Sequence, residues 1–247
     1  MKKLKNLYCN PEKKLECSIE LAKALQKEFW VQLESSINNT NSIPEEVLPK
    51  GPGVIIASGG STGGPHLCLQ PLENLNQSAH ATEKWLRKQG IEAANSITLN
   101  CLPIHHVSGL MPWWRSNVWG SSHKWIQPSL MRDPNELERF SAPFLKQTEL
   151  SILTSLVPTQ LKSLISNPAG ERWLKSLTLI WVGGAKLPER LAKEARKKGI
   201  KLAPCYGATE TAAMVSVLSP KDFLLGKNNV GNPLEDVEIQ VGKNKDL

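Results

Sequence analysis

Strand-like and helical segments alternate along the chain from residue 54 onward. The strand-like runs, rich in β-branched and apolar residues, are 54-VIIAS-58, 97-ITLNCL-102, 150-LSILTS-155, 177-LTLIWV-182 and 214-MVSVLS-219. Between them, helical patterns occupy residues 73–90, 134–148, 158–166 and 188–199. Such alternation favours parallel strands joined by helices that cover the sheet. The sequence therefore predicts an α/β domain with a largely parallel sheet.

The part of the chain before residue 54 shows no such alternation. The stretch 18-SIELAKALQKEFWVQL-33 has apolar residues at helical spacing, which predicts a helix. Residues 35–53 are rich in Ser, Asn, Pro and Gly, which is typical of a linker. We therefore expect a leading helix and linker over residues 1–53 and a core domain over residues 54–247.

Charge, cysteine pattern and hydropathy exclude several classes of protein. The formal charge of +7 would attract anionic substrates, but the basic stretch 190–201 reads as a solvated helix face without the interleaved aromatic residues of nucleic-acid-binding proteins. Five scattered cysteines without a C-x-x-C pair indicate reduced thiols, not a disulfide framework or a zinc site. No apolar run reaches the ~18 residues that a membrane span needs. We therefore expect a cytoplasmic protein without nucleic-acid or membrane partners, and homo-oligomerisation stays open.

A glycine-rich stretch, 58-SGGSTGGPH-66, follows the first of these strands. It lacks the lysine of the motif G-x-x-x-x-G-K-S/T and the spacing of the dinucleotide motif G-x-G-x-x-G. Its backbone N–H groups and the hydroxyls of Ser58, Ser61 and Thr62 could still bind an anion without a cation in the loop. On these residues alone, a phosphate site and a bare turn are both open.

Three further stretches place histidine, glycine or acidic residues after a strand. In 103-PIHHVSGL-110, two adjacent histidines follow a strand, where α/β sheets bind ligands, although most single histidines are surface or core residues. The double glycine of 181-WVGGAKLPERL-191 permits close approach of a ligand, or makes a tight turn into a helix. In 206-YGATET-211, Glu210 could bind Mg²⁺ beside a phosphate or occupy the first turn of a helix.

In their order and spacing, these four stretches resemble the large domain of the adenylate-forming acyl-CoA synthetase superfamily. Residues 58–66 fall on its loop pattern Ser/Thr-Ser-Gly-Ser/Thr-Thr-Gly-x-Pro-Lys, with His66 at the position of the lysine. Residues 206–210 carry its Tyr-Gly-x-Thr-Glu signature, the most specific of the four. The resemblance covers residues 54–241 and implies the adenylate-forming fold.

Two details of the resemblance refine it. Pro103 and His106 match the P-x-x-H motif of the superfamily, which gives the family's role to His106 and not to His105. Residues 155–165 and 182–200 are similar to o-succinylbenzoate–CoA ligases of menaquinone and phylloquinone synthesis. The resemblance therefore implies an AMP-forming ligase for that acid, and a ligase for another carboxylate is the alternative within the family.

The chemistry that the resemblance implies uses ATP, Mg²⁺ and CoA as small-molecule partners. A carboxylate attacks the α-phosphate of ATP to give an acyl-adenylate and pyrophosphate, and the thiol of CoA then displaces AMP. The positive charge that the glycine-rich loop lacks would come from Mg²⁺. The preorganised donors of such a loop suit a reaction in which charge builds on phosphoryl oxygens.

The resemblance also assigns roles to single residues. It implies catalytic roles for His106, Thr209 and Glu210, with His106 beside the acyl substrate, Thr209 at the phosphate and Glu210 on Mg²⁺. The nucleotide-binding set that it implies is Ser58, Gly60, Ser61, Thr62, Gly63, Gly183, Gly184, Ala185, Tyr206, Gly207 and Thr209.

The sequence departs from the family pattern at both ends. The family continues to a Thr-Gly-Asp motif that binds the ribose and to a small C-terminal domain with a catalytic lysine, whereas this sequence ends at Leu247. Residues 1–53 are also shorter than the N-terminal part of the family. We therefore expect an incomplete large domain without the small C-terminal domain. A nucleotide-binding or acyl-binding domain without full turnover is the corresponding alternative.

Overall fold

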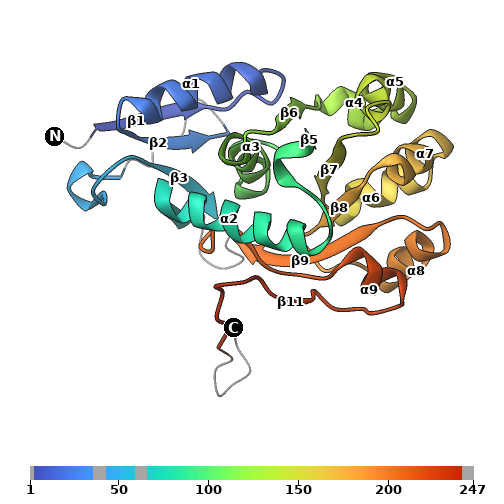
Figure 1. The fold of residues 1–247 in the computed structure, drawn as a ribbon. Coiled ribbons are helices and arrows are strands. Elements are labelled where there is room, and N and C mark those ends of the chain that lie inside the picture. The colour runs from blue at the N-terminus through green and yellow to red at the C-terminus, as the bar shows by residue number, and fades with distance from the viewer. Residues whose placement is uncertain (1–2, 36–42, 59–65, 241–247) are drawn as a thin grey trace.

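Two sheets form the framework of the part of the chain that the computed structural model describes, residues 3–35, 43–58 and 66–240 (Figure 1). The first three strands of the smaller sheet are parallel, and its last strand runs antiparallel to the third. In order, these strands are β1 (Lys3–Tyr8), β2 (Phe29–Glu34), β3 (Gly53–Ser58) and β4 (His66–Pro71).

The larger sheet is parallel except at one edge. Its strands follow the order β11 (Asn232–Pro233), β10 (Ala213–Val217), β9 (Leu202–Ala208), β8 (Leu179–Val182), β7 (Ser151–Leu156), β5 (Ser96–Asn100) and β6 (Ser122–Trp125). The strands from β9 to β6 are parallel, whereas β10 and β11 are antiparallel to their neighbours. The predicted α/β class with a largely parallel sheet is confirmed.

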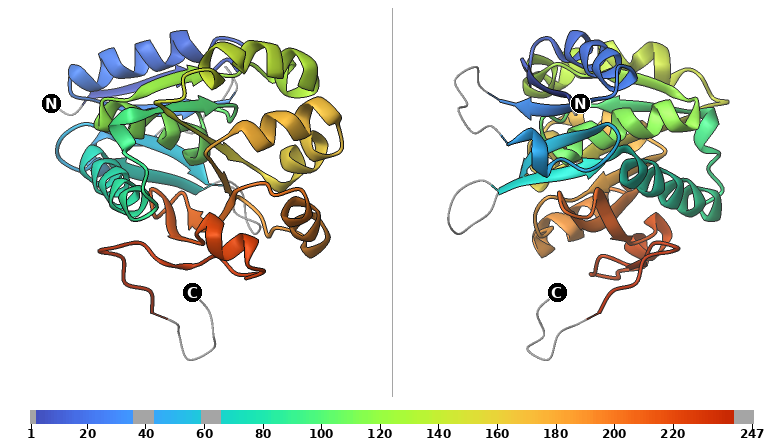
Figure 2. Two further views of the ribbon diagram at one scale, coloured as in Figure 1. Left: turned by 45° about the vertical axis from the view of Figure 1, so that its right-hand side comes forward. Right: turned by 90° about the vertical axis from the view of Figure 1, so that its left-hand side faces the viewer.

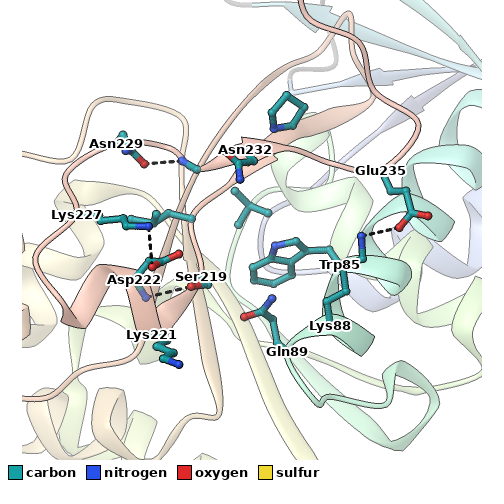
Figure 3. Close-up of a pocket in the computed structure, with 14 residues that line it drawn as sticks. Trp85, Lys88, Gln89, Ser219, Lys221, Asp222, Lys227, Asn229, Asn232 and Glu235 are labelled. Atoms are coloured by element: carbon teal, nitrogen blue, oxygen red, sulfur yellow. Dashed lines mark hydrogen bonds and ion pairs between the residues drawn. The ribbon is translucent and has the colours of Figure 1, made fainter.

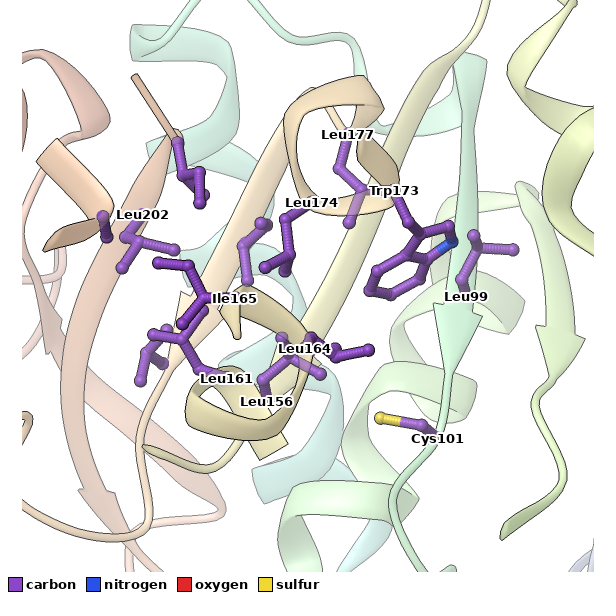
Figure 4. Packing of buried hydrophobic residues seen from close by; sticks show 14 of the residues in the cluster. Leu99, Cys101, Leu156, Leu161, Leu164, Ile165, Trp173, Leu174, Leu177 and Leu202 are labelled. Atoms are coloured by element: carbon purple, nitrogen blue, oxygen red, sulfur yellow. The ribbon is translucent and has the colours of Figure 1, made fainter. Parts of the chain in front are cut away.

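Helices cover both faces of the larger sheet, because its central strands bury side chains on both sides. Along β8, Ile180 and Val182 pack into one hydrophobic cluster, whereas Leu179 and Trp181 pack into another. Figure 4 shows the first cluster around Trp173. It lies against α5 (Pro134–Leu145), α6 (Pro158–Ile165), α7 (Pro168–Ser176) and α8 (Glu189–Lys197). The second lies against α2 (Leu72–Lys88) and α3 (Val107–Trp119).

The N-terminal residues belong to the smaller sheet. Helix α1 (Lys14–Gln26) connects β1 to β2, so the helix predicted over residues 18–33 is wrong in its second half. Residues 29–34 pair with β1 on one side and β3 on the other, and these two rows of backbone hydrogen bonds override an apolar spacing that also fits a helix. The boundary at residue 53 stays a prediction, and strands from both sides of it pair within this sheet.

Lys14 connects α1 to the larger sheet. Its side chain is 1% exposed, and its Nζ donates hydrogen bonds to the carbonyl oxygens of Cys101 at 3.1 Å and Ile126 at 2.8 Å. These carbonyls follow β5 and β6, so one buried cation satisfies acceptors at two neighbouring strand ends. The N-terminal segment is therefore attached near the edge at which α/β sheets bind ligands.

Short helices complete the fold: α4 (Pro128–Arg132), α9 (Pro220–Leu224) and the 3₁₀ turns Glu45–Val47 and Ala93–Asn95. Figure 2 shows α1 at one end of the molecule and β11 at the other. Within the described ranges, no helix combines the length and the apolar character needed to cross a bilayer. The sequence patterns did not predict β1, β4, β6, β11, α3, α4, α7, α9 or the two 3₁₀ turns.

Candidate active site

A cavity of about 510 Å³ lies where the carboxyl ends of β3, β7, β8 and β9 meet the start of α3. Open α/β sheets bind ligands at this edge, where the connections that leave the strands carry the polar groups. Segments far apart in the sequence meet here, from the end of β3 at Ser58 to the start of β10 at Ala213.

Most of the predicted site residues that the structure describes line this cavity. They are Ser58, His106, Gly183, Gly184, Gly207, Thr209 and Glu210. Ala185 and Tyr206 are not among its lining residues; Ala185 is exposed after the double glycine, and Tyr206 is 43% exposed on β9. The remaining predicted residues, Gly60, Ser61, Thr62 and Gly63, lie outside the described part of the chain.

The two histidines occupy different environments. His106 precedes the first turn of α3 and lines the cavity, whereas His105 does not, and their rings lie 4.3 Å apart between centroids. Burial lowers the pKa of His105 to about 4, with a further contribution from His106, and burial also lowers the pKa of His106. Both imidazoles are therefore neutral near pH 7, and His106 offers the cavity a hydrogen-bonding group, not a charge.

The structure explains why both positions of the double glycine carry glycine: the space is limited at Gly183, and the backbone of Gly184 is left-handed. A Cβ atom on Gly183 would lie 2.9 Å from the Sγ of Cys205, which lines the same cavity on β9. Gly184 has a φ of 77°, which L side chains rarely adopt. The tight strand-to-helix turn is thus present, and both glycines also line the cavity, whereas close approach of a ligand to them stays a prediction.

The stretch 206–211 forms the end of β9 and a turn that leads into β10. Glu210 lies in this turn and not in the first turn of a helix, so that alternative is wrong. A Cβ atom on Gly207 would overlap the carbonyl oxygen of Ala213 on β10, which explains the glycine of the signature. Thr209 and Glu210 line the cavity from a hairpin whose two strands are closely packed.

Arg115 is a site residue that the sequence motifs missed. It lies on α3 with 4% of its surface exposed and lines the cavity, and its Nε and Nη2 atoms have no hydrogen-bond partner among the described residues. Its guanidinium carbon is 5.9 Å from the ring centroid of Trp181. Burial lowers the pKa of Arg115 to about 10, and Cys205 partly opposes the shift. The cavity therefore contains a desolvated cation at neutral pH.

A helical interpretation of 107-VSGLMPWWR-115 would have found this residue. Ser108, Met111 and Arg115 follow the i, i+3, i+7 spacing of one helix face, and all three line the cavity. No sequence pattern indicates that the guanidinium lacks a partner, because that depends on the strands packed against α3.

A second cavity, of about 440 Å³, lies between the end of α2 and α9 (Figure 3). Four of its charged groups pair with one another: Lys88 with Glu235 at 2.8 Å and Lys227 with Asp222 at 2.9 Å. None of the predicted site residues that the structure describes lies in it. A third cavity, of about 620 Å³ between α2 and residues 210–215, holds only Glu210 of the predicted site residues that the structure describes. The cavity at the strand ends gathers seven of them and is therefore the candidate active site.

Several known proteins are similar to this chain. The family model of the AMP-binding enzymes matches residues 3–246. An indoleacetate–CoA ligase of Aromatoleum aromaticum is 30% identical over 86% of this chain and 40% of its own length. A 2-succinylbenzoate–CoA ligase of Oceanobacillus iheyensis is 25% identical over 90% of this chain and 44% of its own length. The chain thus spans less than half the length of these curated relatives.

Solved structures agree on the fold. The o-succinylbenzoate–CoA synthetase of Bacillus subtilis, in complex with ATP and magnesium ion, has a TM-score of 0.70 at 19% identity over 100% of this chain and 58% of that one. The same enzyme with its acyl-adenylate intermediate has a TM-score of 0.72. At this identity the likeness shows the fold, and the family match over nearly all residues shows the kinship. The chain therefore belongs to the family of AMP-binding enzymes.

Proposed function

We propose that this chain provides the ATP-binding and acyl-binding part of an AMP-forming acid–CoA ligase whose acid is o-succinylbenzoate. The names of the curated relatives support the reaction class, and several of them act on 2-succinylbenzoate. The observation that carries the choice of acid is Arg115, a buried cation without a hydrogen-bond partner for Nε and Nη2 among the described residues. One carboxylate of this aromatic dicarboxylate reacts, and the other stays charged and needs such a partner.

In this proposal, some residues of the cavity act on the phosphates of ATP and others border the acyl group. The acyl carboxylate attacks the α-phosphate of ATP, and the bond to pyrophosphate breaks; the CoA thiol then attacks the acyl carbon and releases AMP. Thr209 lines the cavity, and in this proposal its hydroxyl donates to a phosphate oxygen, where charge builds during the first step. The neutral ring of His106 borders the acyl group, and Trp181 supplies an aromatic wall beside Arg115.

Mg²⁺ is implied by this chemistry, and the side chains present fit it. Glu210 offers a carboxylate at the cavity, next to the hydroxyl of Thr209. Among the described residues, no cluster of three or more His, Cys, Asp or Glu forms a metal cage. Mg²⁺ suits such a sparse donor set, because it keeps several waters and binds through one or two carboxylates and substrate phosphates. When bound, it would neutralise charge on the phosphates, with Glu210 as its ligand.

The proposed setting is the cytoplasm, with CoA as the second substrate. All five cysteines are free thiols, which fits a reducing compartment. Burial raises the pKa of Cys101 and Cys205 to about 12, so both stay protonated and do not compete with the CoA thiol as nucleophiles.

ATP–pyrophosphate exchange tests the proposal. Exchange should depend on o-succinylbenzoate, and indoleacetate should not replace it, because indoleacetate has no second carboxylate for Arg115. Exchange that prefers indoleacetate would overturn the choice of acid. Binding of ATP and o-succinylbenzoate without exchange would show a binding domain without turnover, and failure to bind either would overturn the proposed function as a whole.

A further inference from the structure

The turn of residues 209–212, which carries Thr209 and Glu210, has strained backbone at its exit. Ala212 has a φ of 51° and Ala213 a φ of 92°, although neither is glycine. Such residues persist only where the surrounding structure holds them, and they cluster at functional sites. Other groups of the fold must therefore hold this turn.

Some of the groups that hold the turn lie within it. The Oγ1 of Thr211 donates to the carbonyl oxygen of Ala213 at 2.7 Å and accepts from the backbone N–H of Ala208 at 3.0 Å. The N–H of Ala212 donates to the carbonyl oxygen of Thr209 at 3.2 Å. These bonds close the turn on itself but do not orient it toward the cavity.

Two side chains from another part of the fold supply the orientation. The Nε2 of Gln70, on β4, donates to the carbonyl oxygens of Thr209 at 2.7 Å and Glu210 at 3.2 Å. The Oγ of Ser78, on α2, donates to the carbonyl oxygen of Ala212 at 2.7 Å. Gln70 is 1% exposed, so its amide cannot turn to solvent instead. The bonds of Gln70 join the smaller sheet, and the bond of Ser78 joins α2, to a hairpin of the larger sheet.

The side chain of Glu210 depends on these backbone contacts. Within the described part of the chain, no hydrogen bond or ion pair holds its carboxylate, whereas its own carbonyl oxygen accepts from Gln70. Because the carboxylate of Glu210 has no partner among the described residues, only the backbone restrains where this residue lies. β4 also begins directly after residues 59–65, so the element that carries Gln70 adjoins the glycine-rich stretch.

We propose that Gln70 and Ser78 are positioning residues that hold the 209–212 turn in the conformation that presents Thr209 and Glu210 to the nucleotide. The role in nucleotide binding rests on the proposed function, whereas the restraint on the turn does not. The bonds act on the backbone before any ligand arrives, so the site is preorganised and binding does not have to order it.

Amide hydrogen exchange of the ligand-free chain tests the restraint. Gln70→Met removes the amide from the buried site, and Ser78→Ala removes the hydroxyl. Each should speed exchange of the amides over residues 206–214 by about ten-fold, because the free energy that a lost hydrogen bond contributes opens the turn. Ser78→Thr, which keeps the hydroxyl, should restore slow exchange. Gln77→Met on the same helix, whose side chain bonds Glu73, is the matched control. Unchanged exchange in Gln70→Met and Ser78→Ala overturns the restraint.

Calorimetry with ATP, with and without Mg²⁺, tests the positioning role. Gln70→Met should lower the gain in ATP affinity that Mg²⁺ provides by about ten-fold, as expected for a group that orients a metal ligand. Equal losses with and without Mg²⁺ would show that Gln70 only stabilises the fold and would overturn the positioning role. A wild-type chain that binds no ATP would overturn the proposed function, and the exchange result would still decide the restraint.

Discussion

Replacing Arg115 with methionine tests the proposed acid most directly. Methionine keeps an unbranched side chain on α3, where Met111 already lines the cavity, and it removes the cation. If Arg115 binds the second carboxylate of o-succinylbenzoate, the variant loses a hydrogen bond between two charged groups, which contributes about 1.5–3 kcal/mol. The affinity for o-succinylbenzoate should therefore fall by about 10- to 150-fold. The affinity for 4-oxo-4-phenylbutanoate, which lacks the ring carboxylate, should not change.

The same variant should make the ligand-free chain more stable. Burial lowers the pKa of Arg115 from 12.5 to about 10, and that shift corresponds to a destabilisation of about 3 kcal/mol. Because the folded pKa is the lower one, the penalty applies below about pH 10 and disappears above 12.5. Methionine removes the penalty and also loses the contact of the cation with Trp181, which contributes about 0.5–2 kcal/mol. The net gain of about 1–2.5 kcal/mol should raise Tm by about 2–10 °C.

Calorimetry with the two acids and thermal unfolding without ligand measure both effects. The expected pattern is opposite in sign: weaker binding of the dicarboxylate and a higher Tm. Arg115→Lys keeps the charge but not the planar fork, so it should recover only part of the affinity. A lower Tm for Arg115→Met together with unchanged affinity for o-succinylbenzoate would show that Arg115 supports the fold, and the proposed acid would lose its main argument.

Three further predictions concern other residues. Glu210→Gln should weaken binding of Mg·ATP by about ten-fold and leave adenosine binding unchanged, because a neutral amide is a poorer Mg²⁺ ligand; equal losses would indicate a structural role. His106→Ala should impair binding of the acyl substrate more than binding of ATP, whereas His105→Ala should change neither; the reverse ranking would show that the motif is assigned one residue off. Burial lowers the pKa of Lys14 from 10.5, so the folded chain binds fewer protons than the unfolded chain just below that pH. The free energy of unfolding should therefore rise as the pH approaches 10.5 from below, and Lys14→Met should flatten this slope in urea titrations; a slope that persists would contradict the assignment.

Local patterns were sufficient to predict most of the elements that build the candidate site. The strand ending at Ser58, the strand before the double glycine and the helix starting near Pro158 all appear where periodicity and proline place them. Those signals are local: alternation of apolar residues, a proline at the first turn, a glycine after the last one. His106 and Thr209 converge because β5 and β9 are parallel strands that end at one edge of the larger sheet, whereas Ser58 ends a strand of the smaller sheet and joins them only through the packing of the two sheets.

The same local rules failed where long-range neighbours decide. Residues 29–34 read as the continuation of a helix, and only their position between β1 and β3 makes them a strand. His106 belongs to the P-x-x-H motif, but the helix that follows it, with Arg115 on the same face, was not predicted. Gln70 has no motif at all, and its role comes from a hairpin more than a hundred residues away in the sequence.

The sequence by itself determined the α/β class, the family and most of the stretches that line the candidate site. It did so because those properties lie in the spacing of neighbouring residues. The tertiary structure alone decided which polar groups are buried and what they contact. Arg115 is a surface-type residue by composition, yet α3 carries it into a cavity where Nε and Nη2 have no partner among the described residues. Desolvation depends on every element packed around a group, and the neighbouring residues in the sequence do not indicate which elements those are.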